Sequence, residues 1–282
     1  MLSTINKMYF LTTNITIQMK TSKKYTREIK QQFGYLATWL PSTPIDLGDI
    51  GILKNNQFTK ISNLSDLGIR FEIKRDETKS DIEHSSKGAV SITTKASGTV
   101  APQGSTLGEV DAGITVEFSK ENAILFKANG TTSPSISDQI ALGKTIIELY
   151  KEGKWEKDWA VITEKVDAES ATILIASSSN GKIEMKAKGE IKAAKLDIAD
   201  AALAFEMIFS KDLSTKIICE ESLTPLFKAS KVHSNLFMSA NFKMNNIQAM
   251  DLMTPEKAKS NDEFLYFGET DFEFDKEEEQ SV

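Results

Sequence analysis

Cysteine and histidine are scarce in this chain of 282 residues, which contains one cysteine, Cys219, and two histidines, His84 and His233. A single cysteine cannot form an intramolecular disulfide, and this composition is typical of a reducing compartment, so we expect a cytoplasmic protein. Structural zinc sites are usually built from four cysteine and histidine ligands, which these three residues cannot supply. The sequence therefore predicts neither a metal site nor a bound cofactor.

Long apolar runs are also missing. A membrane-spanning helix takes roughly 20 consecutive apolar residues, and no stretch of the chain approaches this length. Threonine and asparagine interrupt the N-terminal run Met8–Ile17, so it lacks the apolar segment of roughly 7–15 residues that an export signal requires. We expect neither a membrane-spanning helix nor export.

Motifs that identify a reaction are absent as well. The tetrapeptide Leu142-Gly143-Lys144-Thr145 resembles the end of a phosphate-binding loop, but such a loop needs a glycine where this chain has Asp138. The tetrapeptide also falls inside a predicted helix, so we interpret Gly143 as a close-packing position. Cys219 and His233 lack neighbours that would mark them as a nucleophile and its base. The sequence favours a protein without enzymatic activity.

Excess positive charge is missing too. The net charge is −6, and the lysines of the segment Lys182–Lys192 alternate with glutamates. Binding to a phosphate backbone requires a net basic stripe. We therefore expect no nucleic-acid partner.

Alternation of apolar and polar residues is the clearest positive signal. In Lys182–Lys192 the two kinds alternate strictly, which predicts a strand with one buried face and one wet face. The run Thr172–Ser177 before it is almost continuously apolar, and Asn180-Gly181 between the runs is a strong hairpin signal. The lysines of this amphipathic hairpin are candidate functional residues: Lys182, Lys186, Lys188 and Lys192.

Strand signals outnumber helical ones, so the predicted fold class is α+β with a strand majority. We expect a twisted, mostly antiparallel sheet with long hairpins. The one clear helix spans residues 135–152, with Ser135 or Ser137 as its N-cap and Gly153 as its end. The predicted organisation is a polar, basic leader over residues 1–30 that need not be ordered, one β-rich domain over 31–261, and a tail over 262–282.

The tail combines acidic residues with aromatic rings. Residues 262–282 contain nine acidic residues and one lysine, so they carry a net charge of −8 and the rest of the chain carries +2. A solubilising tail has no need of aromatic rings, because exposed rings promote association. We predict that four rings anchor the tail: Phe264, Phe267, Phe272 and Phe274.

Three functions are compatible with these patterns. The first is a non-enzymatic intracellular interaction protein, whose acidic and aromatic tail docks on the β-rich core, on a protein partner or on a second copy. The second is a conditionally membrane-inserting pore former that its own C-terminal tail inhibits until the tail is released. The third is a carrier of a small apolar ligand.

The pore-forming alternative depends on strand length. A membrane-spanning strand needs about 9–11 alternating residues. Four segments are long enough: Ser91–Val100, Ile114–Lys127, Ala160–Ser177 and Lys182–Lys192. In this general plan the chain is similar to gasdermin-type pore formers, which implies hairpins that insert after an inhibitory segment leaves. Ala187 and Gly189 count against insertion, because they add little transfer free energy to the apolar face.

Overall fold

The computed structural model describes residues 20–101, 103–188, 198, 205–219, 223–235 and 264–272. Strands predominate in mostly antiparallel sheets, with two helices among the described residues, which confirms the predicted strand-majority α+β class. The chain divides into two compact units. Unit 1 comprises Met1–Pro44, Asp76–Thr132 and Val166–Pro225, and unit 2 comprises Ile45–Arg75, Ser133–Lys165 and Leu226–Val282. The domain predicted over residues 31–261 thus contains parts of both units.

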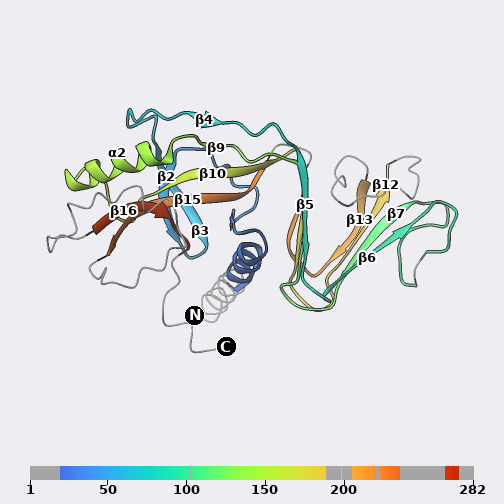
Figure 1. The fold of residues 1–282 in the computed structure, drawn as a ribbon. Helices are drawn as coiled ribbons and strands as arrows, with labels where there is room; N and C mark the ends of the chain where they lie inside the picture. The colour runs from blue at the N-terminus through green and yellow to red at the C-terminus, as the bar shows by residue number, and fades with distance from the viewer. Residues whose placement is uncertain are drawn as a thin grey trace, which may run out of the picture. The chain divides into compact units, whose positions relative to one another are not determined.

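Unit 1 contains two four-stranded sheets, called sheets B and C here (Figure 1). Sheet B has the order β14-β11-β8-β5, with β5 (Ser80–Ser85), β8 (Ile124–Thr131), β11 (Ser170–Ala176) and β14 (Leu213–Cys219). Sheet C has the order β13-β12-β7-β6, with β6 (Val90–Lys95), β7 (Gly113–Phe118), β12 (Lys182–Ala187) and β13 (Phe205–Lys211). Each strand of sheet B is therefore the sequence neighbour of the strand at the same position in sheet C.

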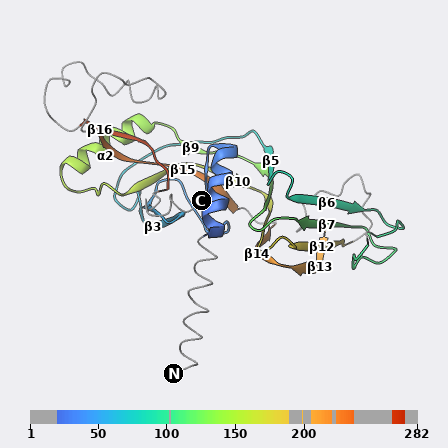
Figure 2. The same cartoon turned by 90° about the horizontal axis from the view of Figure 1, so that it is seen from below.

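The connections between these paired strands lie side by side and bend the chain at a corner. Backbone hydrogen bonds join neighbouring connections: Ser119 N to Ala89 O (3.0 Å), Phe118 N to Gly181 O (2.8 Å) and Ser177 N to Asp212 O (2.9 Å). The ladder thus continues around the bend. Sheets B and C thus meet at a sharp corner with their strands in the same order, and Figure 2 shows the strands of sheet C side by side.

The hairpin predicted at Asn180-Gly181 is wrong. The flanking strands β11 and β12 do not pair with each other, because β11 pairs with β8 and β14 whereas β12 pairs with β7 and β13. Residues 177–181 form part of the corner instead. All seven residues of β11 are buried, and a strand that is apolar on both faces belongs in the middle of a covered sheet. Burial therefore decides the pairing here, against the local turn signal.

Apolar side chains of both sheets meet inside the bend. Leu174 of sheet B packs with Val116 and Ile183 of sheet C in one buried cluster. Successive side chains of a strand point to opposite faces, and the ring of Phe126 on β8 lies 5.8 Å from Phe33, which belongs to a helix. Sheet B is therefore covered on both faces.

This helix comprises residues 20–33 and differs from the leader predicted over residues 1–30. Tyr25 and Ile29, one helical turn apart, are fully buried. Glu28 accepts a hydrogen bond from Ser86 Oγ (2.6 Å) and lies 2.8 Å from His84 Nε2. The helix packs on the rest of unit 1 because its apolar residues repeat with helical spacing. The many lysines of this segment obscured that pattern in the sequence. Residues 1–19 lie outside the described residues.

Unit 2 is built on sheet A, in which the order β15-β10-β2-β3 is extended by β16 beside β15, β9 beside β10 and β4 beside β9. Its strands are β2 (Asp49–Lys54), β3 (Gln57–Asn63), β4 (Ile73–Lys74), β9 (Ser135–Ile136), β10 (Ala160–Ala168), β15 (Leu223–Asn235) and β16 (Phe264–Glu269). The first residues of β15, up to Pro225, belong to unit 1. There the short strand β1 (Leu36–Ala37) lies beside them, and Thr38 N donates to Pro225 O (2.9 Å).

The second helix, α2 (Gln139–Lys151), begins four residues later than predicted. Ser135 belongs to β9 instead, and the N-cap is Asp138, whose Oδ1 accepts a hydrogen bond from Ala141 N (2.8 Å). Aspartate and serine are similarly good N-caps, so the sequence alone did not separate them. Gly153, at φ +70°, follows the end of the helix as predicted.

Candidate functional site

The C-terminal strand β16 lies along an edge of β15 in unit 2. Six consecutive residue pairs join the two strands, from Asn235↔Phe264 to Ser230↔Glu269. Thr270 N continues this pattern by donating to Ala229 O (2.9 Å). Among the described residues, β15 is the one strand that pairs with β16. The described part of the tail is therefore held first of all by its backbone.

On one face of β16, Phe267 packs against helix α2 at Gly143. A Cβ atom on Gly143 would lie 3.0 Å from Cβ and 3.2 Å from Cδ1 of Phe267, which is closer than carbon atoms normally pack. Phe267 joins the buried cluster of Leu142, Ile146 and Val232. The close-packing role predicted for Gly143 is confirmed, since this glycine leaves a notch for the ring.

On the opposite face, Tyr266 stacks on His233. Their ring centroids are 5.0 Å apart and their planes differ by 17°. Burial lowers the pKa of His233 below its ordinary value of 6.5, so the ring is neutral at neutral pH. A neutral ring with its proton on Nε2 donates to Gly268 O, which lies 3.3 Å away. The same histidine therefore contacts both a side chain and the backbone of β16.

The structure places two of the four predicted anchors against the core of unit 2. Phe267 occupies the notch, and Phe272 is 5% exposed with its ring edge-on to Phe227 at a centroid distance of 6.4 Å. The side chain of Phe264 and the whole of Phe274 lie outside the described residues. Rings in the middle and at the C-terminal end of the described segment thus contact the rest of unit 2.

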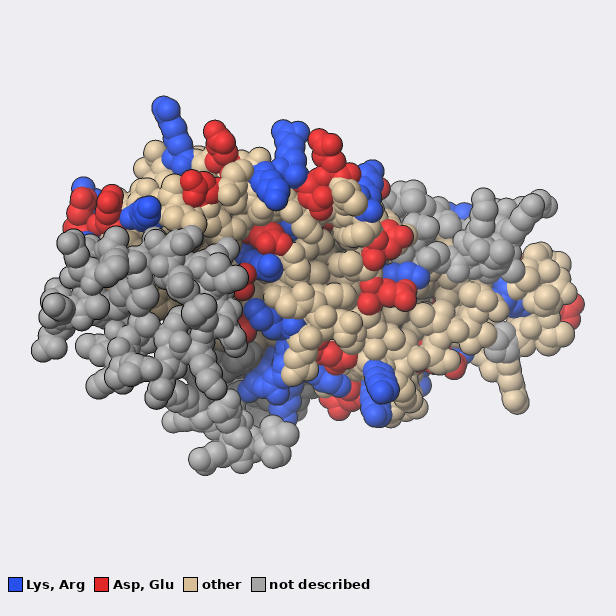
Figure 3. All heavy atoms as spheres, in the orientation of Figure 1, with Lys and Arg blue, Asp and Glu red and all other residues tan. Residues whose placement is uncertain are grey.

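Charge contributes little to this contact. Lys228 Nζ lies 3.7 Å from Glu269 Oε1 and 3.3 Å from Glu164 Oε2. The side chain of Glu269 is 54% exposed, and exposed ion pairs stabilise by about 0–1 kcal/mol. Figure 3 shows acidic and basic side chains intermingled over β4 and α2 rather than gathered by sign. Rings and backbone hydrogen bonds, more than charge, hold β16.

One of the predicted lysines, Lys182, belongs to a second site, on sheet C. Lys182 Nζ lies between two carboxylates, 2.9 Å from Glu184 Oε1 and 3.2 Å from Glu117 Oε1. The hydrogen bond to Glu184 raises the pKa of Lys182 more than burial lowers it. This lysine is therefore held as a cation between strands β7 and β12.

Among the other candidate lysines, Lys186 has a different partner from Lys182. Lys186 Nζ lies 2.9 Å from Asp111 Oδ1, and this hydrogen bond holds the pKa of Asp111 below its usual range. Lys188 is exposed, and Lys192 lies outside the described residues. The two lysines of β12, Lys182 and Lys186, are thus each held in an ion pair with a carboxylate.

The face that we predicted as wet is partly buried. Glu184 is fully buried, and its carboxylate is in contact with the connection between β6 and β7. The described residues of this connection, 96–101 and 103–112, are called the strap here. Thr106 donates to Glu184 through its backbone N (2.7 Å) and its Oγ1. Lys95 fastens the strap by donating to the carbonyl oxygens of Gly108 (2.9 Å) and Asp111 (2.6 Å). Burial raises the pKa of Glu184, but these hydrogen bonds and Lys182 outweigh it and keep that pKa below its ordinary value.

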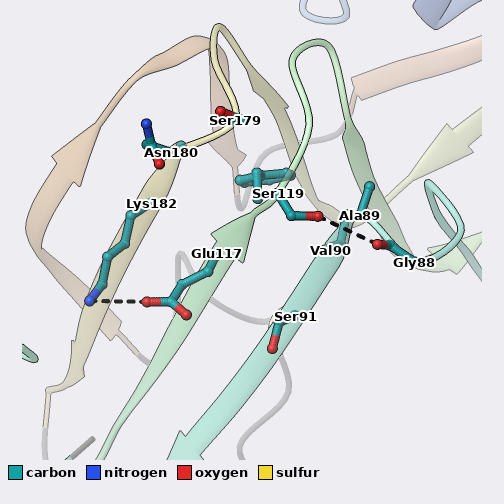
Figure 4. Close-up of a pocket in the computed structure, with 11 residues that line it drawn as sticks. Gly88, Ala89, Val90, Ser91, Glu117, Ser119, Ser179, Asn180 and Lys182 are labelled. Carbon is teal, nitrogen blue, oxygen red and sulfur yellow. Dashed lines mark hydrogen bonds and ion pairs between the residues drawn. The ribbon is translucent and has the colours of Figure 1, made fainter. Parts of the chain in front are cut away.

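A groove of about 480 Å³ opens at the corner beside this network (Figure 4). It is lined by residues 88–91, 117–119 and 179–182. Ser91, Glu117 and Lys182 form a cross-strand row along it, and in Figure 4 the Lys182 ammonium meets the Glu117 carboxylate. The Lys182–Glu117 ion pair of this row therefore lines the groove at the corner.

Several residues of these two sites escaped the sequence analysis. His233 was considered only as a base, and its contact with Tyr266 depends on a register between distant strands. Glu184 was assigned to the wet face, because strand alternation carries no information about a covering loop. The one local signal for the β16 site in the sequence was Gly268, a glycine that directly follows two aromatic residues.

The described residues contain neither a membrane-spanning helix nor a metal-binding cluster. Within the described ranges, no helix has both the length and the apolar character needed to cross a membrane. In the same part of the chain, no three His, Cys, Asp or Glu side chains are grouped so that they could hold a metal ion. Neither protein-family models nor curated proteins match this chain.

Proposed function

We propose that this chain is a non-enzymatic interaction protein that binds an extended, aromatic protein segment along the edge of β15 beside α2. This place, which β16 occupies, is called the groove between β15 and α2 here. The observation that carries the proposal is the way its own β16 occupies that groove. The strand is paired along β15 through six residue pairs while Phe267 fills the notch at Gly143. Adding an extended segment to a sheet edge is a recurrent mode of protein recognition, in which the backbone supplies affinity and alternate side chains supply specificity.

The strand β16 competes with such a partner segment for the edge of β15. Residues 236–263, which are 28 residues, connect β15 to β16. Because β15 and β16 belong to the same chain, β16 pairs at an effective concentration on the order of mM. A partner segment at micromolar concentration therefore binds after β16 has been weakened or displaced. The proposal includes a protein partner or a second copy of this chain as the donor of that segment.

Binding in trans provides the test. The acceptor is full-length protein carrying Phe267→Ala, which weakens its own strand, and the probe is a fluorescently labelled peptide of residues 262–275. We expect fluorescence anisotropy to show saturable binding at least about 10-fold tighter to this variant than to the wild-type chain, because the cis competitor is weakened. A peptide carrying Phe267→Ala is the matched control. If the folded variant, checked by circular dichroism, does not bind the wild-type peptide, the proposal fails.

A specific observation also favours the second function, membrane insertion. Because every strand of sheet B continues into sheet C in the same order, straightening the corner would produce four long strands: residues 80–95, 113–131, 170–187 and 205–219. Each exceeds the roughly 9–11 residues that a membrane-spanning strand needs. The corner itself opposes insertion, since it would place Lys120, Glu121 and Asn122 at mid-strand.

Dye release from anionic liposomes separates the two functions. Insertion under control of β16 predicts leakage from a full-length Gly143→Val variant, in which the strand is displaced, and none from the wild-type chain. Equal retention of dye with both proteins eliminates pore formation and leaves the interaction function.

The third expectation, a carrier of a small apolar ligand, has weaker support. A described opening of about 260 Å³ is lined by Met185, Phe205 and Ile218 but also by Lys216, so its lining is mixed. Pockets for ligands of drug size usually enclose about 300–1,000 Å³. We do not propose this function.

A further inference from the structure

We infer that the groove between β15 and α2 recognises a particular sequence: two aromatic residues, then glycine, then an acidic residue, as in Tyr266-Phe267-Gly268-Glu269. This inference rests on the proposed function and names its partner class, a protein segment that presents this pattern in an extended conformation. Each of the four positions meets a different part of unit 2.

The residue that contacts the first aromatic position is His233. Tyr266 and His233 are directly opposite each other on β16 and β15, and their rings stack at 5.0 Å. A planar ring at this position covers the imidazole, whereas an aliphatic side chain leaves one of its faces bare. The stacked geometry therefore selects an aromatic residue.

The second aromatic position is read by α2. Phe267 is directly opposite Val232 and lies over Gly143. The notch exists because residue 143 has no side chain, and the neighbouring Leu142 and Ile146 are buried beside it. A flat ring fits between strand and helix there, while a smaller side chain would leave the cluster underpacked.

The glycine position is restricted by the first aromatic ring. A Cβ atom on Gly268 would lie 3.2 Å from Cε2 and 3.3 Å from Cδ2 of Tyr266, and 4.0 Å from Cδ2 of His233. A side chain at this position would push the tyrosine away from His233, so the stack and the glycine belong together. An edge glycine covered by an aromatic ring is a known device for stabilising strands.

The acidic position contributes least. Glu269 faces Lys228 at 3.7 Å, and Lys228 is already paired with Glu164. An acidic residue is therefore accepted here but is not decisive. Specificity is concentrated in the aromatic, aromatic and glycine positions.

A peptide panel tests this recognition, with full-length Phe267→Ala protein as the acceptor and labelled peptides of residues 262–275 as probes. We expect Tyr266→Ala and Gly268→Val peptides to bind at least about 10-fold more weakly than the wild-type peptide, and Glu269→Gln less than about 3-fold more weakly. The Gly268→Val peptide is decisive, because the two explanations predict opposite effects. Valine is a better strand former than glycine, so it would strengthen binding that depends on strand addition alone.

The acceptor provides a second readout. Adding His233→Ala to it removes the stacking partner, so we expect the wild-type and Tyr266→Ala peptides to become nearly equal in affinity, as a double-mutant cycle requires. If Gly268→Val binds as tightly as the wild-type peptide, sequence recognition is wrong although strand addition stands. If the wild-type peptide itself does not bind, the proposed function fails together with this inference.

Discussion

Valine in place of Gly143 will detach the strand β16 from α2 while the rest of unit 2 stays folded. The new side chain would collide with Phe267, whose Cβ lies 3.0 Å from a Cβ at residue 143. Overpacking of this kind costs about 1–3 kcal/mol, and the helix itself is not weakened, because valine is a better helix former than glycine. The edge strand gives way first, since β15 is its one strand neighbour among the described residues.

Hydrogen–deuterium exchange measures this release. We expect the amides of residues 264–270 to exchange about 10–100-fold faster in the variant, because each 1.4 kcal/mol changes an equilibrium about tenfold. Lys144→Val is the matched control: it adds the same side chain one residue further along α2, at an exposed position. Unchanged protection of β16 in Gly143→Val would show that the notch does not hold the strand.

The second large effect concerns the two carboxylates that share Lys182. We expect Glu184→Ala to lower the free energy of unfolding by about 2–4 kcal/mol, because it removes the buried partner of the ammonium and leaves Thr106 N–H without its acceptor. We expect Glu117→Ala to cost less than about 1 kcal/mol, since the side chain of Glu117 is 55% exposed. Urea unfolding monitored by tryptophan fluorescence compares the two. Equal costs would mean that the strap does not isolate Glu184 from solvent.

Lowering the pH should reproduce part of this loss of unfolding free energy. The pKa of Glu184 is lowered in the folded protein from an ordinary value of 4.5, so the unfolded chain takes up its proton first as the pH falls. The contribution of the carboxylate to stability is therefore complete above about pH 4.5 and disappears as the pH falls through the folded pKa. The stability difference between wild type and Glu184→Gln should be constant near neutral pH and shrink below 4.5. A difference independent of pH down to 3 would contradict this assignment.

The sequence was a good guide to local structure and to the residues that pack. Strict alternation correctly predicted an extended segment at β12, and the almost continuous apolar run before it was correctly assigned to a strand, which is β11. Gly143 was identified as a close-packing position, though not its partner Phe267. These predictions hold because strand period and side-chain size act on near neighbours in the chain.

Pairing and coverage were decided by the tertiary structure. Alternation indicates that Lys182–Lys192 has two different faces, but it does not say which strands lie beside it or whether a loop covers the polar one. Glu184 is buried in contact with the strap, and the corner at 177–181 replaces the expected hairpin. The helix over residues 20–33 likewise depends on an apolar surface of sheet B that is assembled from distant segments.

By itself, the sequence of this protein determined a strand-rich α+β chain, the approximate position of α2 and an aromatic segment near residues 264–272. Only the tertiary structure decided that this segment pairs with β15, that Phe267 meets Gly143 and that Tyr266 meets His233. The physical reason is that propensity and periodicity depend on residues close in sequence. The groove, in contrast, is formed by elements that burial of apolar surface brings together across the chain.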